Sequence, residues 1–458
     1  MSIAAVPDYL GKDFSGASPG MRFGMYLPIW TERADQEREV KKRAAGKSRE
    51  GDEVTALLQR GMDTTIAELC KRERNRLPGL WDKNDFAARE AWEKVVALRT
   101  DDKRLMVGLH NRQTAIADAL PTEALLRLDA RSVAPFTTGL GNEHPLENGF
   151  AFLNPYGLPY LPGSGVKGVL RQAARELASG DWGETHGWSE DKRYTLMEGE
   201  EQDRRPLLDK NKQPVMLSML DVLFGRETAG GESDHIRGAL TFWDVIPQIQ
   251  GDSLAVEIMT PHQSHYYQID KKKNPQPPHF QSPHDSGQPV PISFLTVPPG
   301  SGFAFHVVCD TAHLGRLAPT LLKDGADSKP QWQDLLTAAF EHAFEWLGFG
   351  AKTAVGYGAM ARLSEQEVAA ARQESEAASL HCDWVDQTVS DLARKHNAKE
   401  SDTLRSKGLA EAWVALSDPD LKARALADIR ARWSKHGWWN APQGGSAKKA
   451  KAIYEAGE

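Results

Sequence analysis

The chain has 458 residues, of which 40% are hydrophobic, and its 56 Lys and Arg against 63 Asp and Glu give a formal net charge of −7. This length suits roughly three domains with sizeable cores, and the acidic balance excludes a protein that coats nucleic acid through overall positive charge. No apolar run approaches the ~20 residues of a membrane span, and the first residues lack the apolar core of a secretory signal. We therefore expect a cytoplasmic protein without membrane contact, in which any binding of nucleic acid is local.

Three cysteines, Cys70, Cys309 and Cys382, lie far apart in the sequence. They form no CxxC pair, so the pattern predicts neither a disulfide framework nor a cysteine zinc site. We expect all three to be reduced and structural.

The texture of the chain predicts three regions. Residues 1–125 form a largely helical, charged region in which opposite charges interleave at helical spacing, as on a solvated helix face. Residues 126–364 contain short β-rich runs broken by Gly and Pro, and residues 365–458 form a charged helical tail. The tryptophans of this tail are compatible with protein docking or with helix packing: Trp413, Trp433, Trp438 and Trp439.

The middle region predicts a mainly antiparallel sheet crossed by two helices, which is an α+β sandwich. The expected strands are residues 132–136, 238–245, 254–259, 292–297 and 303–308, with a last short strand after Gly358. One amphipathic helix begins near Ser164 as its N-cap, and the other runs from about Pro330 to Gly348. Residues 179–232 and 270–291 are expected to be long inserted loops.

Two glycine-rich segments, residues 160–171 and 348–358, are tied to these helices. Glycines let backbone N–H groups approach an anion, and Lys167 and Lys352 supply the counter-charge. In the first helix, Lys167, Arg171 and Arg175 recur every four residues and form a basic stripe. The second segment is not a Walker A loop, because Ala351 precedes its lysine and the segment follows a helix. We expect the two bends to converge on a trough that grips the backbone of a nucleic acid.

An ordered set of motifs resembles the RAMP superfamily of CRISPR-associated proteins. The run TGLGNEHPLENGF at residues 138–150 is followed by PYLPGSGVKGVLR at 159–171, RGALTFWD at 237–244, TPH at 260–262, FLTVPPG at 294–300 and the second glycine-rich segment. Within the superfamily, the set is similar to the sixth-subunit family of the type III-B Cmr effector complex. The resemblance covers roughly the middle half of the chain. It departs from the family at Gly165, where a second Ser is common, and at Glu257, where Asp is expected.

The resemblance implies a ferredoxin-like (RRM-like) RAMP fold with long insertions and peripheral helical regions. It further implies a non-catalytic RNA-binding subunit without a cofactor, which caps the backbone filament of the complex and holds the 3′ portion of the guide RNA. The implied partners are guide RNA, a neighbouring RAMP backbone subunit and a small helical subunit, with target RNA left open as a further partner.

The residues expected to contact RNA combine the helix start, the basic stripe and the second glycine-rich segment. The phosphate contacts are Gly163, Ser164, Lys167, Arg171, Lys352 and Thr353. Further candidates are Arg175, Arg237, His262 and Tyr357, the last by stacking on a base.

Two other functions are compatible with the sequence. His144, in a glycine-rich turn, is the candidate general base or acid of a metal-independent RNA endonuclease, although its neighbours favour a folding or RNA-contact role. A purely protein-binding adaptor subunit is the other alternative. The loop histidines His262, His265, His279 and His284 form only a weak metal signal without cysteine or paired carboxylates, so we expect no metal site.

Overall fold

The computed structural model describes residues 4, 6, 8–11, 13–32, 81–83, 88–199, 204–209, 211–226, 235–260, 291–323, 325, 329–370 and 382–457. The chain divides into two compact units, residues 1–362 (unit 1) and residues 363–458 (unit 2). Each unit has a hydrophobic core of its own. In unit 1, residues of the N-terminal region such as Phe23 and Trp92 belong to the same core as Phe136 and Phe305.

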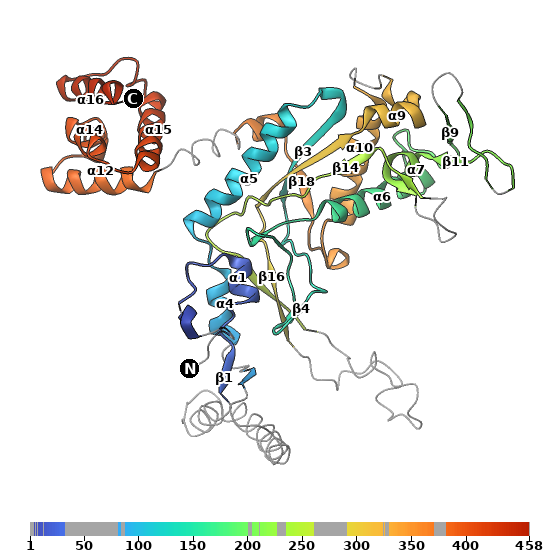
Figure 1. Cartoon of the computed structure of the whole chain (residues 1–458), viewed down its shortest axis with the longest axis horizontal. Coiled ribbons are helices and arrows are strands. Elements are labelled where there is room, and N and C mark those ends of the chain that lie inside the picture. Colours follow the sequence, from blue (N-terminus) through green and yellow to red (C-terminus); the bar gives the residue numbers. More distant parts are fainter. Residues whose placement is uncertain are drawn as a thin grey trace, which may run out of the picture. The chain divides into compact units, whose positions relative to one another are not determined.

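A four-stranded antiparallel sheet forms the centre of unit 1 (Figure 1). Its order is β14 (Leu240–Phe242), β17 (Gly302–Cys309), β3 (Leu125–Ser132) and β18 (Met360–Arg362). In chain order these are the second, third, first and fourth strands. Along the chain, helix α6 (Gly163–Ser179) lies between β3 and β14, and helix α10 (Gln331–His342) lies between β17 and β18. The mixed α+β class expected from the sequence is therefore confirmed.

Strand β3 does not lie where the sequence predicts it. The expected strand at residues 132–136 is wrong, because β3 ends at Ser132 and only Phe136 forms an isolated bridge, to Val297. The charged residues of this strand obscure its hydrophobic pattern in the sequence. Leu128 and Ala130 face the core, whereas Arg127 and Asp129 alternate with them and form an ion pair of 2.9 Å on the other face.

One face of the sheet packs against α6 and α10 through aromatic and aliphatic side chains. The Phe305 ring of β17 lies 5.2 Å from Phe340 and 5.0 Å from Phe349, between ring centroids. Both helices were predicted because their apolar residues recur at helical spacing. Helix α10 continues as a π-helical turn, η9 (Ala343–Leu347), and ends before Gly348, whose φ of +69° suits glycine.

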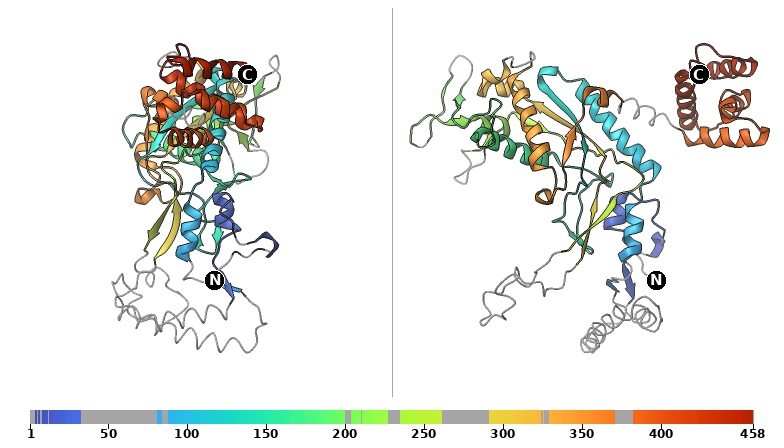
Figure 2. Two further views of the ribbon diagram at one scale, coloured as in Figure 1. Left: turned by 90° about the vertical axis from the view of Figure 1, so that its left-hand side faces the viewer. Right: turned by 180° about the vertical axis from the view of Figure 1, so that it is seen from behind.

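Helix α5 (Thr100–Asp118) lies over part of the opposite face of the sheet, as Figures 1 and 2 show. His306 of β17 points to this side and is only 2% exposed, with Trp243 stacked on it at 5.3 Å between centroids. Burial lowers the pKa of His306 to about 4, and Arg127 opposite it on β3 adds to this shift. This sheet face is therefore closed around His306, whereas Arg131, Thr241 and Ala361 on the same face are exposed.

Smaller elements extend unit 1 beyond this sheet. The segment 179–232, expected to be an irregular loop, contains two short strand pairs and a helix, because its apolar residues Leu217, Val222 and Phe224 join the main core. These elements are β8 (Arg193–Thr195), β9 (Met197–Glu198), β10 (Arg205–Pro206), β11 (Met216–Ser218) and α7 (Met219–Phe224). The other short strands are β4 (Glu143–His144), β5 (Glu147–Asn148), β6 (Phe152–Leu153), β7 (Leu158–Pro159), β12 (Gly225–Arg226), β13 (Ile236–Arg237), β15 (Ala255–Met259) and β16 (Ile292–Thr296). Helix α9 (Thr311–Leu317) follows β17.

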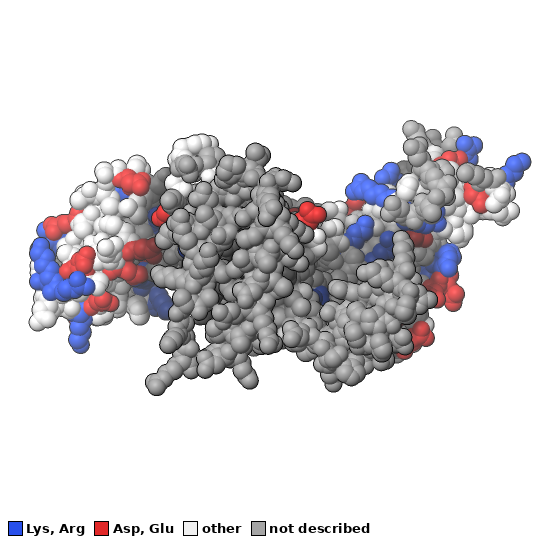
Figure 3. Space-filling view, turned by 90° about the horizontal axis from the view of Figure 1, so that it is seen from below, with Lys and Arg blue, Asp and Glu red and all other residues white. Residues whose placement is uncertain are grey.

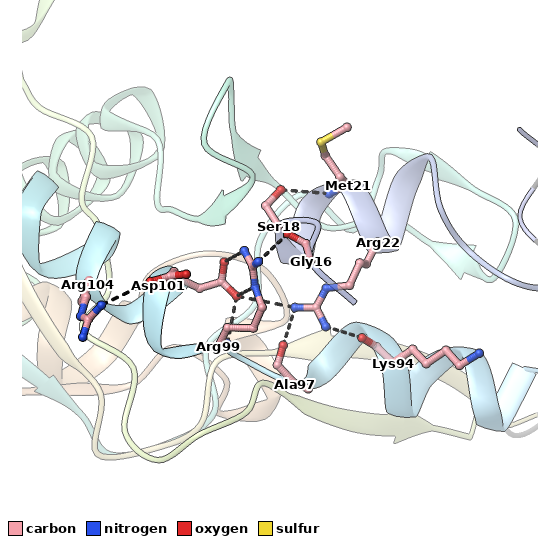
Figure 4. Close-up of polar contacts among 10 residues, drawn as sticks. Gly16, Ser18, Met21, Arg22, Lys94, Ala97, Arg99, Asp101 and Arg104 are labelled. Atoms are coloured by element: carbon pink, nitrogen blue, oxygen red, sulfur yellow. Dashed lines mark hydrogen bonds and ion pairs between the residues drawn. The ribbon is translucent and has the colours of Figure 1, made fainter. Parts of the chain in front are cut away.

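A buried arginine ties the N-terminal elements together (Figure 4). Arg22 lies in α1 (Pro19–Gly24) and donates to the carbonyl oxygens of Lys94 and Ala97, at the end of α4 (Ala88–Val96). Its guanidinium lies 3.7 Å from Asp102, which also pairs with Arg99 at 2.7 Å. Helices α1, α4 and α5 thus meet at the Arg22 guanidinium. The short strands β1 (Trp30–Glu32) and β2 (Trp81–Lys83) pair nearby.

The described residues of unit 2 form a bundle of helices. Trp413 and Trp433 are buried in its core with Tyr454, so these two tryptophans pack helices. The helices are α12 (Asp383–His396), α13 (Glu400–Thr403), α14 (Lys407–Val414), α15 (Pro419–Lys435) and α16 (Gly445–Ala456). Cys382 and, in unit 1, Cys309 are buried free thiols, whereas Cys70 lies outside the described residues.

Candidate nucleic-acid interface

The start of helix α6 is capped by an acid from a distant segment. The helix begins at Gly163 with Pro162 as its N-cap residue, so the expected N-cap at Ser164 is wrong. The Gly163 amide donates to Oδ1 of Asp244 at 2.7 Å, and a Cβ at Gly163 would lie 2.2 Å from the Phe242 carbonyl oxygen. Asp244 thus takes the first free N–H of the helix. Ser164, one residue on, is exposed, and its N–H has no acceptor among the described residues.

The basic stripe of α6 is present as expected along one side of the helix. Lys167 and Arg171 are partly buried, and Arg175 is exposed and donates to Gln172 at 3.2 Å. The Arg171 Nε atom is buried without a hydrogen-bond partner among the described residues. No ion pair with a described carboxylate is recorded for any of the three. Within the described part of the chain, these three cations on α6 therefore have no neutralising acid.

Lys167, at the start of the stripe, projects away from the contact between Glu176 and α10. Glu176 of α6 lies 2.7 Å from Nε2 of His342 at the end of α10. Glu176 is nine positions after Lys167, and at 100° a position the two side chains project from opposite sides of the helix. The start of α6 contacts the end of β14, and the segment 348–358 contacts residues 135 and 137 beyond the end of β3, so both bends lie toward the end of the sheet where β17 starts. The described contacts do not join the two bends into one trough.

The second glycine-rich segment is a compact turn held by backbone hydrogen bonds. Its Phe349 amide donates to the Gly358 carbonyl, and the Ala351 amide donates to the Thr137 carbonyl at 2.8 Å. Gly350, Lys352, Gly356 and Gly358 all have positive φ. Three of these are glycines, and Lys352, at φ +60°, is one of few described residues with a side chain in this conformation. The fold therefore fixes where Lys352 projects.

The Lys352 side chain lies against the hairpin of β15 and β16. Its Nζ is 5.1 Å from the centroid of the Phe294 ring and close to the Met259 sulfur. Burial lowers the pKa of this amine. The Tyr357 ring packs edge-on against the same Phe294 ring at 5.5 Å, and burial together with nearby Glu257 raises the pKa of its hydroxyl. Lys352 and Tyr357 thus share one aromatic surface, while Thr353 begins the short turn η10 (Thr353–Val355) beside them.

Arg237 lies far from this turn. Its side chain is exposed and 3.4 Å from Asp310, just after the end of β17, whereas the turn contacts residues beyond Ser132, opposite the start of β17. The eight residues of β17 separate the two places by roughly 25 Å. His262 and the other loop histidines lie outside the described residues. Among described residues, no group of three or more His, Cys, Asp or Glu side chains could hold a metal ion, and none of their helices could span a membrane.

His144, the nuclease candidate, is held inside the fold. Its ring stacks on Phe23 at 3.7 Å, its Nε2 is 2.9 Å from the Phe23 carbonyl oxygen, and its Nδ1 accepts from the Leu146 amide at 3.1 Å. This pairing defines a neutral ring with hydrogen on Nε2 and both nitrogens engaged. His144 borders an open cavity of about 320 Å³ that also reaches Tyr160. The geometry matches a folding role and not a proton shuttle.

Sequence reasoning missed two residues that shape these sites. Asp244 ends the RGALTFWD motif, and its position in that motif was the available signal for a structural partner. Phe294 begins FLTVPPG and supports both Lys352 and Tyr357. Where described residues are visible in Figure 3, basic and acidic side chains are interspersed and form no single basic face.

Comparison with known proteins agrees with the motif pattern. The family model of the RAMP superfamily matches residues 129–361. The chain is 29% identical over 240 residues to the CRISPR system Cmr subunit Cmr6 of Pyrococcus furiosus, an alignment that covers 48% of this chain and 63% of that protein. The match therefore spans less than two thirds of the curated relative.

Solved structures share only a distant likeness. A type III-B Cmr-beta complex bound to cognate target RNA has a chain that matches with a TM-score of 0.35 and 17% identity, covering 72% of this chain and 95% of that one. The crystal structure of Cmr6 from Pyrococcus furiosus matches with a TM-score of 0.25 and 24% identity, and the match covers 52% of this chain and 98% of that one. A chain of a type IV-B CRISPR complex matches with a TM-score of 0.29 and 14% identity, and the match covers 52% of this chain and 89% of that one.

Proposed function

The chain belongs to the RAMP superfamily, and on that premise we propose that it is a non-catalytic, RNA-binding subunit of a type III-B CRISPR effector complex. The sequence similarity to Cmr6 supports this place among the superfamily's subunits. The β-α-β-β-α-β order of the central sheet supports a ferredoxin-like core. In the proposed role, the subunit caps the backbone filament, holds the 3′ portion of the guide RNA and contacts a backbone subunit and a small helical subunit in the cytoplasm.

The observation that carries this proposal is the RAMP match itself, because residues 129–361 include both glycine-rich segments and most of the central sheet. The basic stripe on α6 adds three cations without acidic partners in the described structure, which suits a phosphate track. Since α5 lies over the other sheet face and buries His306 there, the proposed RNA path runs over the helix side and its loops and not over the sheet, as it would in an RRM.

Not all predicted contacts fit this path equally. Ser164, Lys167, Arg171 and Arg175 lie along α6, and we propose them as one group of phosphate contacts. Lys352, Thr353 and Tyr357 form a second group at the turn beyond α10. Gly163 serves the helix start, because Asp244 occupies its amide. Arg237 is proposed only as a peripheral contact, since it lies at the other end of β17.

A nuclease footprint of the guide RNA tests the proposal. The assembled complex is treated with a single-strand-specific nuclease, with and without this chain, and the protected guide fragments are sequenced. We expect protection at the 3′ end to disappear without this chain while 5′ protection persists. Unchanged 3′ protection would refute the guide-holding role. Cleavage of guide or target RNA by the purified chain would refute the non-catalytic one.

A further inference from the structure

Two exposed tryptophans lie side by side on the surface of unit 1, at the ends of α6 and α10. Trp182, in the turn after α6, is 51% exposed, and Trp346, in η9, is 59% exposed. Their ring centroids are 5.5 Å apart. By contrast, Trp188 and Trp332 are 2% or less exposed in the same unit. An exposed pair of the largest apolar side chains is unusual on a monomer and typical of an interface.

The pair stands on a rigid base. Trp182 packs edge-on against the His342 ring at 5.3 Å, and His342 is itself buried and 2.7 Å from the Glu176 carboxylate. This contact joins the end of α6 to the end of α10. The two rings are thereby held in place without covering each other, because their planes are tilted by 58°. A partner that binds here meets a preformed surface and loses little side-chain entropy on that side.

The charge around the pair selects the class of partner. Residues 176–188 and 341–347, which carry the two tryptophans, contain five acidic residues and no Lys or Arg. The acids are Glu176, Asp181, Glu184, Glu341 and Glu345. Of these, Glu341 pairs with Arg362 at 2.6 Å and Glu176 with His342, whereas Asp181, Glu184 and Glu345 are exposed. A polyanion such as RNA is repelled from this surface, and a cationic side chain over an indole ring is favoured.

We propose that Trp182 and Trp346 form a docking site for a protein partner that presents a lysine- or arginine-bearing segment. The tryptophans supply the central apolar contact, and the three exposed carboxylates form a rim that attracts the cations. The inference rests on the proposed function only in that the partner is taken to be another subunit of the complex. RNA and a second copy of this chain are the competing occupants.

Photo-cross-linking identifies the occupant directly. The full chain carries benzoylphenylalanine at the position of Trp346, or, as the control, at the position of Ile258, which is 61% exposed on β15. The complex is reconstituted with its remaining subunits and guide RNA, irradiated and analysed by mass spectrometry. We expect position 346 to cross-link to a basic peptide of another subunit and position 258 not to reach that peptide. A cross-link to RNA or to another copy of this chain, or none at all, would overturn the proposal.

Substitution separates this proposal from the general function. In Trp182→Ala/Trp346→Ala we expect incorporation into the complex to fall at least tenfold, with RNA binding by the isolated chain unchanged. Glu184→Lys/Glu345→Lys should also reduce incorporation while both indoles remain. Control substitutions of two other exposed apolar residues, Val133→Ala/Ile116→Ala, should leave incorporation unchanged. If the wild-type chain assembles and the tryptophan variant assembles equally well, the proposed docking site is wrong. If the wild-type chain never enters the complex, the proposed function itself is wrong.

Discussion

The carboxylate of Asp244 accepts a hydrogen bond from the Gly163 amide at 2.7 Å, so a negative charge lies at the start of the helix that carries the basic stripe. We expect Asp244→Ala to lower the free energy of unfolding by about 1 kcal/mol, because the helix loses its cap. The same change should raise the affinity for RNA, since a repulsive charge disappears and one N–H becomes free.

Asp244→Asn is the matched control, because it removes the charge but keeps an acceptor for the Gly163 amide. It should retain more stability than Asp244→Ala and still bind RNA more tightly than the wild-type chain. Urea denaturation and fluorescence anisotropy with a labelled single-stranded RNA measure the two effects. Weaker RNA binding in both variants would show that the start of α6 does not face a phosphate.

Charge reversal on the stripe tests the phosphate track itself. Lys167→Glu/Arg171→Glu should weaken RNA binding by at least tenfold at moderate salt, because two phosphate contacts become repulsive. The slope of log affinity against log salt concentration should fall by about 2. The control Arg316→Glu/Lys323→Glu makes the same change of charge at exposed positions on and after α9. Equal losses in both variants would mean that only overall charge matters.

Helices α6 and α10 were predictable from the sequence because their apolar residues repeat at helical spacing, a local property. Strand β3 was not, because Arg127 and Asp129 neutralise each other on the strand and disguise its alternation. The cap of α6 was equally hidden, since Asp244 is 81 residues from Gly163. The motifs thus locate the glycines and cations in the sequence. They do not show from which side of the fold each cation projects, because that depends on how the helices pack.

The turn at residues 348–358 provides a matched pair of glycines. Both Gly356 and Gly358 have positive φ, at +94° and +72°. A Cβ at Gly358 would lie 1.8 Å from the Phe349 carbonyl oxygen, whereas a Cβ at Gly356 would meet nothing within 4 Å. Gly356→Ala should therefore cost only about 1 kcal/mol for its backbone conformation.

Gly358→Ala adds a clash with main chain to the same backbone cost, so we expect a loss of more than 2 kcal/mol and a displaced Lys352. Thermal unfolding and RNA binding should both be impaired in this variant and nearly normal in Gly356→Ala. Similar behaviour of the two alanine variants would contradict the close packing of the turn.

The buried His306 makes the stability of unit 1 depend on pH. Burial lowers its pKa from the ordinary 6.5 to about 4, with a further contribution from Arg127. Between these values the unfolded chain binds a proton that the folded chain does not, so stability falls as the pH drops from about 6.5 toward 4. The loss from this one group is on the order of 2–3 kcal/mol at pH 4, and it does not grow further below the folded pKa.

His306→Gln removes the titrating imidazole and leaves a polar side chain between Trp243 and Arg127. Carboxylates also titrate in acid, so the comparison with the wild-type chain isolates the histidine. We expect the variant to be less stable than the wild-type chain at pH 7.5, because the packing with Trp243 changes, and to lose less stability on acidification. Urea denaturation at pH 7.5, 6.5, 5.5 and 4.5 measures the difference. A constant difference across this range would mean that His306 titrates normally and that α5 does not seal the sheet face.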